Sequence, residues 1–187
     1  MGQSRIKTRA ATLVFGILST AAADAATISV QQSGSVAAIV TVQGTLEARD
    51  GERFFAKIAP LTTATVRLQG SGGSVLAGIQ IGETIRLKNM ETIVPAGGRC
   101  ASACALAWLG GTRRFLASGA RVGLHSASDP KSGHVSGTGN ALLGAYLNRL
   151  GLSYSTVAYL VQAAPDSITW LGIADAKRLG IEVNSPN

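Results

Sequence analysis

Blocks of apolar residues alternate with polar and glycine-rich segments along most of the chain. Runs rich in β-branched residues predict strands over residues 36–46, 65–68, 91–94, 113–116, 121–124 and 181–183. Apolar residues at three- and four-residue spacing predict helices over residues 75–87, 140–150, 154–163 and 173–179. Segment 102–109 is nearly all apolar, which predicts a short buried helix. Strands that alternate with helices favour an α/β fold with a parallel or mixed sheet covered by helices.

Polar stretches separate these elements. Residues 27–35 form a polar lead-in to the first strand, and residues 126–139 form a Gly/Ser-rich loop. The pair Asp50-Gly51 predicts a hairpin turn over residues 49–52. Gly180 follows the last predicted helix and is typical of a helix C-terminus.

The first 25 residues have the build of a secretory signal peptide. Arg5, Lys7 and Arg9 precede an apolar run that is shorter than the roughly 20 residues of a membrane-spanning helix. An A-x-A cleavage pattern follows at Ala23 to Ala25, so the mature chain is expected to begin near Ala26, in the periplasm or outside the cell. An uncleaved N-terminal anchor is the alternative. No later segment reaches spanning length without a charge, so no membrane contact is expected after cleavage.

Chain length and charge bear on the number of domains and on nucleic-acid binding. A chain of 187 residues suits one domain, here residues 36–187 behind the lead-in at 26–35. The formal net charge of +7 would fall to +5 on removal of the leader, which holds three basic residues and one acidic residue. The basic residues are scattered and do not interleave with aromatic residues, so nucleic-acid binding is not expected.

Two glycine-containing turns carry candidate chemistry. In Gly70-Ser71-Gly72-Gly73, bare backbone N–H groups could hold a developing oxyanion, although a simple tight turn explains the pattern too. In the segment from Gly98 to Ala105, Ser102 opens a helix after a strand, where a nucleophile is often placed. The alternative role for Ser102 is that of a helix N-cap.

The third candidate site is His125, at the end of the apolar strand 121–124. Clefts of α/β proteins lie at the carboxyl ends of such strands, so His125 could act as a base, although a lone histidine there is often structural. The other histidine, His134, lies in the polar loop and is expected to be solvated.

These sites, in this order, resemble the Clp protease proteolytic subunit and its ClpP/crotonase superfamily. The resemblance covers about residues 36–183, and its four segments are VRLQGSGGSVLAGIQIGETIR, GRCASACALAWLGG, RRFLASGARVGLH and LGIADAKRLGIEV. It implies a single domain built as a spiral of ββα units. It also implies that Ser102 is the nucleophile, that His125 is the base, and that backbone N–H groups of Gly72, Gly73 and Ala103 form the oxyanion hole.

The chain departs from the family at several points. Proline is missing before Gly72, and cysteines stand two residues on each side of Ser102. The loop after His125 is Gly/Ser-rich, where the Clp protease has a helical handle that builds its rings, so homo-oligomer formation is left open. The cysteines are similar to those of an exported branch of the superfamily.

An oxidising compartment predicts a disulfide between Cys100 and Cys104. Ideal helical i,i+4 positions place Cβ atoms about 5–6 Å apart. A disulfide needs roughly 3.5–4.5 Å, so the bond requires that Cys100 lie outside the helix, in the turn before Ser102.

The acid of a catalytic triad is the least defined residue. The family takes it from the loop before its closing helix, which implies Asp166, although the register is about two residues early. Asp175 falls inside the helix, and Asp129 lies in the loop after His125. A Ser102–His125 dyad without an acid is the alternative.

The sequence thus predicts an exported serine hydrolase that acts on peptide or protein substrates and needs no cofactor. A non-catalytic binding module on the same fold is the main alternative. A CoA-dependent enzyme similar to crotonase and a metal site built from Cys100, Cys104, His125 and His134 are two further alternatives.

Overall fold

The computed structural model describes residues 25–33 and 37–186. Residues 1–24, which hold nearly all of the predicted signal peptide, lie outside this part of the chain. Within the described residues, none of the helices is both long and apolar enough to cross a bilayer.

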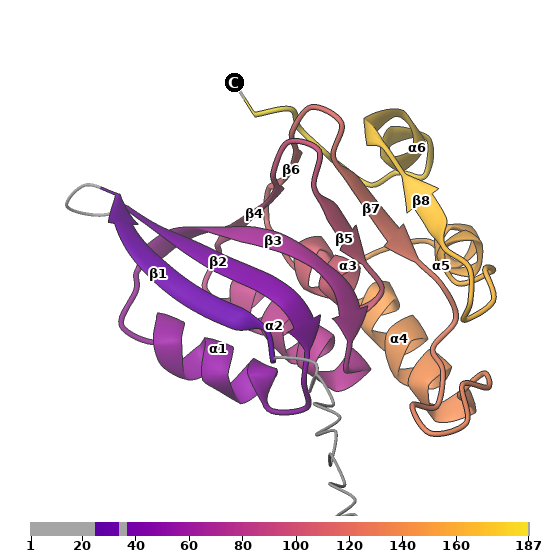
Figure 1. The fold of residues 1–187 in the computed structure, drawn as a ribbon. Coiled ribbons are helices and arrows are strands. Elements are labelled where there is room, and N and C mark those ends of the chain that lie inside the picture. The colour runs from indigo at the N-terminus through magenta and orange to yellow at the C-terminus, as the bar shows by residue number, and fades with distance from the viewer. Residues whose placement is uncertain (1–24, 34–36, 187) are drawn as a thin grey trace, which may run out of the picture.

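In the described part of the chain, eight strands make one mixed sheet (Figure 1). Their path is β1-β2-β3-β5-β7-β8, and β4 branches from β3 to pair with β6. The outermost pairs, β1 with β2 and β7 with β8, are antiparallel, and all other pairs are parallel. The strands are β1 (Thr27–Ser33), β2 (Ala37–Leu46), β3 (Thr63–Gly73), β4 (Glu91–Val94), β5 (Arg99–Ala101), β6 (Arg114–Leu116), β7 (Arg121–Leu124) and β8 (Thr169–Leu171).

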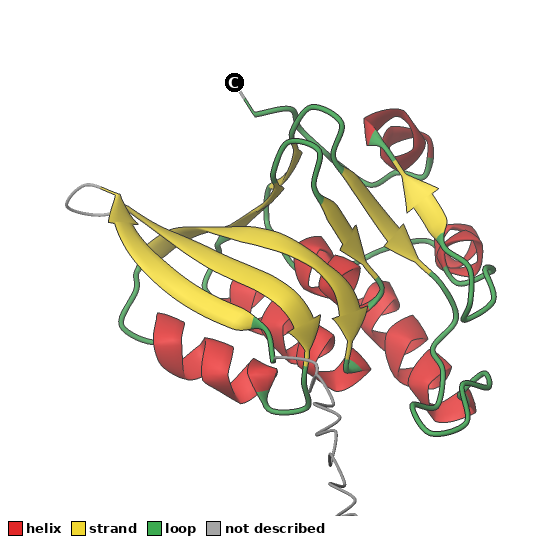
Figure 2. Ribbon diagram, in the orientation of Figure 1, coloured by secondary structure: helices red, strands yellow, loops and turns green. Residues whose placement is uncertain are grey.

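Among residues 25–33 and 37–186, six helices accompany the sheet, and α1 and α2 lie along one face of its β1–β2–β3 part (Figure 2). Helix α3 is buried at every position and packs between α2 and the sheet. The helices are α1 (Asp50–Ile58), α2 (Val75–Leu87), α3 (Ala103–Leu109), α4 (Gly137–Arg149), α5 (Tyr154–Leu160) and α6 (Ile173–Arg178). The predicted α/β fold with one domain is therefore confirmed.

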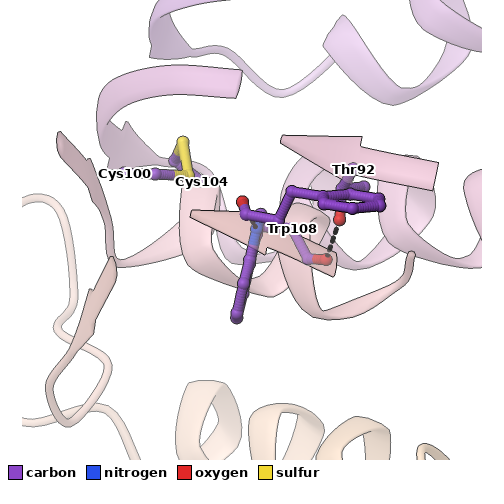
Figure 3. The surroundings of a disulfide bond; sticks show 5 residues. Thr92, Cys100, Cys104 and Trp108 are labelled. Atoms are coloured by element: carbon purple, nitrogen blue, oxygen red, sulfur yellow. Dashed lines mark hydrogen bonds between the residues drawn. A yellow bond between two sulfur atoms is a disulfide. The ribbon is translucent and has the colours of Figure 1, made fainter. Parts of the chain in front are cut away.

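Trp108 on α3 joins the helix to the sheet in the core. Its indole N–H donates to the carbonyl of Phe115, and its own carbonyl accepts from the hydroxyl of buried Thr92 (Figure 3). These bonds satisfy polar groups that burial would otherwise penalise. They also hold α3, and the turn that precedes it, at a fixed position against β4 and β6.

Several predicted elements differ from the structure. The segment 27–35, predicted as a polar lead-in, contains strand β1, because Ile28 and Val30 point toward the core while Ser29 faces solvent. The predicted turn at 49–52 is wrong: helix α1 begins at Asp50 and packs Phe54 and Ile58, four residues apart, into the core.

The C-terminal part contains two further differences. The predicted strand 181–183 is absent, and only Asn184 forms an isolated bridge, to Phe115. Conversely, the short strands β5 and β8 were not anticipated. The predictions for residues 75–87, 91–94 and 121–124 match α2, β4 and β7 at both ends.

Candidate active site

The three predicted sites meet at one edge of the sheet. Strands β3, β5 and β7 are parallel neighbours, with Gly70 opposite Cys100 and Ala101 opposite Gly123. Parallel neighbours end at the same edge, so the glycines that end β3, the serine after β5 and the histidine after β7 lie together. Topology brings these segments together although about 50 residues separate the first from the last.

Ser102 stands at a sharp bend between β5 and α3. Its backbone has φ 53° and ψ −124°, a conformation that L-residues other than glycine rarely adopt. The N–H of Ser102 donates to the carbonyl of Gly123 at 2.7 Å, which ties the bend to β7. Such a bend after a strand and before a helix lifts a serine side chain out of the chain path.

Other helix N-caps of the same chain show what Ser102 does not do. Ser74, Ser136 and Ser153 have extended backbones, and each hydroxyl accepts from a backbone N–H three residues later. Ser102 also stands at an N-cap position, but its hydroxyl makes no capping bond. Ser102 is half-buried, and its strained backbone is not explained by capping.

Gly72 lies directly against the Ser102 bend. A Cβ at Gly72 would fall 2.5 Å from the Ser102 Cβ and 3.0 Å from the nitrogen of Ala103. Gly72 and Gly73 have φ of 108° and 119°, which exclude most other residues. Both belong to the end of β3, not to a loop after it as predicted, because their ladder with β2 continues past an irregularity to Leu46 and Gly73.

A backbone donor is available beside Ser102. Ala103 is the first residue of α3, and no acceptor for its N–H is found in the described part of the chain. The bare backbone of Gly72 lies next to both the Ser102 side chain and the Ala103 nitrogen. An oxygen that gains negative charge there would find N–H donors without side-chain obstruction.

A disulfide joins Cys100 to Cys104 across the bend (Figure 3). Cys100 lies in β5 and Cys104 in α3, with a Cα–Cα distance of 5.1 Å. The predicted bond is therefore present and Cys100 lies outside the helix, although in a strand and not in a turn. The bond closes a small loop around Ala101, Ser102 and Ala103.

His125 is half-buried just past the end of β7. Its Nδ1 lies 2.8 Å from the carbonyl oxygen of Ser126. A carbonyl oxygen only accepts, so Nδ1 carries the proton and Nε2 is left as the free acceptor. No hydrogen bond joins the side chains of His125 and Ser102 in the described structure.

No hydrogen bond joins Asp166 to His125 in the described structure. Asp166 is exposed in the loop between α5 and β8, and no hydrogen bond or ion pair of its side chain is found among the described residues. The loop does reach the site elsewhere, since the carbonyl of Ala163 accepts from both the N–H and the hydroxyl of Ser126. Ser126 therefore positions His125 through its main chain, a role that no side-chain motif signals.

The other candidate acids have different partners. Backbone N–H groups of Ser132 and then Lys131 lower the pKa of Asp129, which closes a turn in the loop. The backbone N–H of Gly172 and then Arg178 lower the pKa of Asp175 at the start of α6. No hydrogen bond joins either carboxylate to the His125 imidazole in the described structure.

The alternative metal site does not form. Cys100 and Cys104 are joined to each other, and His134 is exposed in its loop as predicted. No group of three or more metal-binding side chains occurs among residues 25–33 and 37–186.

Solved structures with a related fold were found by comparison. ClpP1 from Listeria monocytogenes and a mutant of it superpose with TM-scores of 0.56 and 0.62, at 20% and 19% identity, over 80% and 79% of this chain and 92% and 91% of theirs. The chain has the Clp-protease fold. A mutant of the membrane-bound stomatin-specific protease 1510-N gives a TM-score of 0.57 at 18% identity, over 81% of this chain and 78% of the other.

The superfamily resemblance predicted from four motifs is confirmed at the level of this fold. No protein-family model matches the chain, and no curated protein matches it in sequence. Identities of 18–20% carry no residue-by-residue assignment. The roles of Ser102, His125 and the backbone donors are therefore argued below from this chain alone.

Proposed function

We propose that this protein is an exported serine peptidase in which Ser102 is the nucleophile and His125 the base. The strained backbone of Ser102 carries the proposal. Strain of this kind costs of the order of 1–3 kcal/mol and persists where function requires it. It lies at the sheet edge where a histidine with a free Nε2 meets the Ala103 N–H, for which no acceptor is found in the described part of the chain.

The reaction follows acyl-transfer chemistry. The Ser102 Oγ attacks the substrate carbonyl carbon while its proton passes to Nε2 of His125. The N–H groups of Ala103 and Gly73, with Gly72 beside them, hold the oxyanion. The C–N bond then breaks, and the departing amine takes the proton from His125. Water, deprotonated by His125, hydrolyses the Ser102 ester to release the acid and restore the enzyme.

A dyad describes the site better than a triad with Asp166. The third member of a triad fixes the imidazole tautomer and stabilises the imidazolium. In this chain the Ser126 carbonyl accepts from Nδ1, so it can fix the tautomer. A carbonyl stabilises positive charge less than a carboxylate does, so we expect modest hydrolytic rates.

Export is part of the same proposal. The leader-like residues 1–25 and the disulfide at Cys100–Cys104 both suit a periplasmic or extracellular protein. Peptide or protein substrates are proposed because the structural neighbours are named as proteases. Homo-oligomer formation stays a prediction.

Labelling by a fluorophosphonate probe tests the proposal. Wild type should form a covalent adduct at Ser102 and Ser102→Ala should form none. Ser118→Ala, which removes an exposed serine away from this edge, is the matched control and should label as wild type does. A folded wild-type protein that does not label would instead favour the non-catalytic binding module. Cleavage of a fluorogenic peptide library by wild type, and not by Ser102→Ala, would separate peptidase activity from other hydrolysis.

A further inference from the structure

The buried carboxylate of Asp50 contacts three groups near the start of the fold. Asp50 is fully buried at the first position of α1, and its Oδ1 pairs with Arg53. Its Oδ2 accepts from the N–H of Glu47 at 2.7 Å and from the N–H of Ala26 at 3.3 Å. Ala26 is also fully buried, although it stands just before β1.

The nitrogen that Asp50 holds is the atom that leader cleavage would release. The A-x-A pattern ends at Ala25, so cleavage breaks the bond between Ala25 and Ala26. Water adds hydroxyl to the Ala25 carbonyl and a proton to the Ala26 nitrogen. That nitrogen becomes an α-amino group, which is protonated at neutral pH. A neutral amide donor would thus be replaced by a cation beside a buried carboxylate.

We infer that removal of residues 1–25 by an endopeptidase creates an ion pair between the new Ala26 ammonium and Asp50. Charge-assisted hydrogen bonds are about twice as strong as neutral ones, and burial limits screening by solvent. The two oxygens of Asp50 then serve two cations, Arg53 at Oδ1 and Ala26 at Oδ2. The cleavage site is therefore also a docking site for the N-terminus that cleavage makes.

This ion pair lies close to the strand end that carries the candidate oxyanion glycines. Glu47, held by Asp50, directly follows Leu46, the last residue of β2. Leu46 pairs with Gly73, and its carbonyl accepts from the N–H of Ser74 at 2.8 Å. Processing is thereby inferred to stabilise the Gly72–Gly73 edge as well, a step that rests on the proposed function.

Three forms of the processed chain test the ion pair. One begins at Ala26, one begins at Ala26 and is N-acetylated, and one begins at Ala25, which moves the ammonium about 3.8 Å along the chain. Urea unfolding should give the free Ala26 form an equilibrium constant for folding about fivefold above those of the other two. Equal stability of the free and acetylated Ala26 forms would overturn the inference.

Asp50→Asn provides the matched test of the partner. This substitution should remove the difference in stability between the free and acetylated Ala26 forms. A stability difference that persists would assign the effect to another group. If Asp50→Asn does not fold, the comparison of the three wild-type forms still decides the matter.

Faster fluorophosphonate labelling of the free Ala26 form would support the link to the glycines, and equal labelling of all forms would overturn that link. No labelling of any form would contradict the proposed function without touching the stability result.

A separate observation concerns the outer face of β5, β7 and β8. Arg99 and Arg121 are directly opposite in the ladder, and both guanidinium groups lie over the indole of Trp170, at 5.9 and 5.4 Å from a ring centroid. Both arginines are exposed, and neither forms an ion pair in the described structure. Two like charges side by side destabilise a sheet unless a partner neutralises them.

This face leads toward the candidate active site. Side chains alternate along a strand, so Arg121 and Gly123 share one side of β7, and His125 directly follows Leu124, the last residue of the strand. The side chains of Ile168 and Trp170 cover Gly123 on that side. Arg121 is about 13 Å along the strand from His125, which is the length of about four residues of an extended peptide.

We propose that Arg99, Arg121 and Trp170 bind acidic side chains of a polypeptide substrate about four residues from the scissile bond; this rests on the proposed function. The indole holds the guanidinium groups in place, and the missing carboxylates come from the substrate. Charge complementarity and continuity with the sheet edge at His125 together select an acidic peptide as the occupant.

Binding to the Ser102→Ala protein tests this without requiring catalysis. A fluorescent peptide with four glutamates should bind about tenfold more tightly than its glutamine counterpart, and less tightly as salt is added. Adding Arg99→Gln and Arg121→Gln should remove that preference. The matched pair Arg49→Gln and Lys57→Gln, exposed at α1, removes the same charge and should keep it. Arg99→Glu with Arg121→Glu should shift the preference to a lysine peptide.

Three results would overturn the acidic-peptide proposal. One is equal affinity for the glutamate and glutamine peptides. Another is an equal loss of binding in the Arg49/Lys57 pair, which would indicate a general charge effect. The third is tighter binding of a single-stranded oligonucleotide or an anionic vesicle through Arg99 and Arg121, which would assign the face to a different partner. Because Ser102 is absent from the assay, none of these results bears on whether Ser102 is a nucleophile.

Discussion

At the scale of single residues, the backbone of Ser102 sets the site apart. Only Asn89 and Ser102 have positive φ among the described residues other than glycine. Asparagine tolerates that region because its side chain bonds locally, whereas serine at ψ −124° has no such compensation. The strain is a measurable property of the folded protein, independent of any substrate.

Replacement of Ser102 by glycine should therefore relieve strain. We expect Ser102→Gly to be more stable than Ser102→Ala by roughly 0.5–1 kcal/mol, because removal of the Cβ offsets the entropy that glycine loses on folding. At Ser29, an exposed extended position in β1, the same pair should show the opposite order. Thermal unfolding of the four variants measures this, and the same order at both positions would contradict the strain argument. Neither Ser102 variant should label with the fluorophosphonate.

Asp166 provides the second test at this scale. Because the Ser126 carbonyl accepts from Nδ1 of His125, Asp166→Asn should leave the rate of Ser102 acylation within about threefold of wild type. The acylation rate is measured by quenching the fluorophosphonate reaction at fixed times and quantifying the labelled protein. A loss of about 100-fold with the fold intact would restore Asp166 as the triad acid.

The sequence indicated the candidate residues of the site but not the groups that contact them. Ser102, His125 and the paired glycines are recognisable because side-chain identity and position after a strand carry the signal. The Ser126 carbonyl is not, because every residue has a carbonyl and only the folded chain shows which one faces the imidazole. Asp50 was interpreted as part of a turn for a similar reason, since its partners are backbone N–H groups brought together by the fold.

At the scale of elements, two of the errors fall where glycine conceals regular structure, at the end of β3 and at the start of α1. Strand β3 continues through Gly70 to Gly73. The sequence predicts a turn for this segment because glycine is unfavourable in strands. The close approach of Gly72 to Ser102 explains why glycine is needed there. Helices with clear periodicity, such as α2, were predicted at both ends.

The disulfide between β5 and α3 should stabilise the bend. Its loop is small, so the chain-entropy estimate for Cys100→Ala with Cys104→Ala is a loss of about 2 kcal/mol. Urea unfolding with and without reductant checks this: reductant should destabilise wild type and leave the double variant unchanged. We also expect slower Ser102 acylation in the double variant, and an unchanged rate would show that the bend holds without the bond.

Helix α2 passes very close to the start of α3. A Cβ at Gly78 would lie 2.3 Å from the carbonyl oxygen of Ala103, so Gly78→Ala must push the two helices apart. We expect a loss of about 1–3 kcal/mol in stability together with slower acylation, since the Ala103 N–H is the proposed oxyanion donor. Gly144→Ala in α4 is the control: nothing lies within 4 Å, so alanine should stabilise that helix by up to about 1 kcal/mol. Unfolding curves that show the same effect for both would contradict the close-packing argument.

At the scale of the whole molecule, the fold is shared with other proteins, so it does not determine the activity, which depends on the residues of the candidate site. The Clp-protease fold accounts for the order β3, α2, β5, α3, β7 and for the shared sheet edge. Fold alone does not fix function, so the strained serine, the histidine tautomer and the open donors must support the activity themselves. Order of motifs along the chain was enough to predict this fold, because each motif sits at the end of a strand.

Export is the last prediction and concerns the chain as a whole. Expressed from Met1 in a bacterium with a periplasm, the protein should be recovered there with Ala26 as its first residue and with no free thiols. A chain that begins at Ala26 should stay in the cytoplasm, where its cysteines are reduced. Ala25→Phe, which spoils the small-residue cleavage pattern, should leave an uncleaved and membrane-associated product. For each expressed form, N-terminal sequencing identifies the first residue, and mass spectrometry counts the free thiols. A wild-type periplasmic protein that begins at Met1, or one retained in the membrane, would favour the uncleaved anchor and would leave the Ala26 nitrogen as an amide beside Asp50.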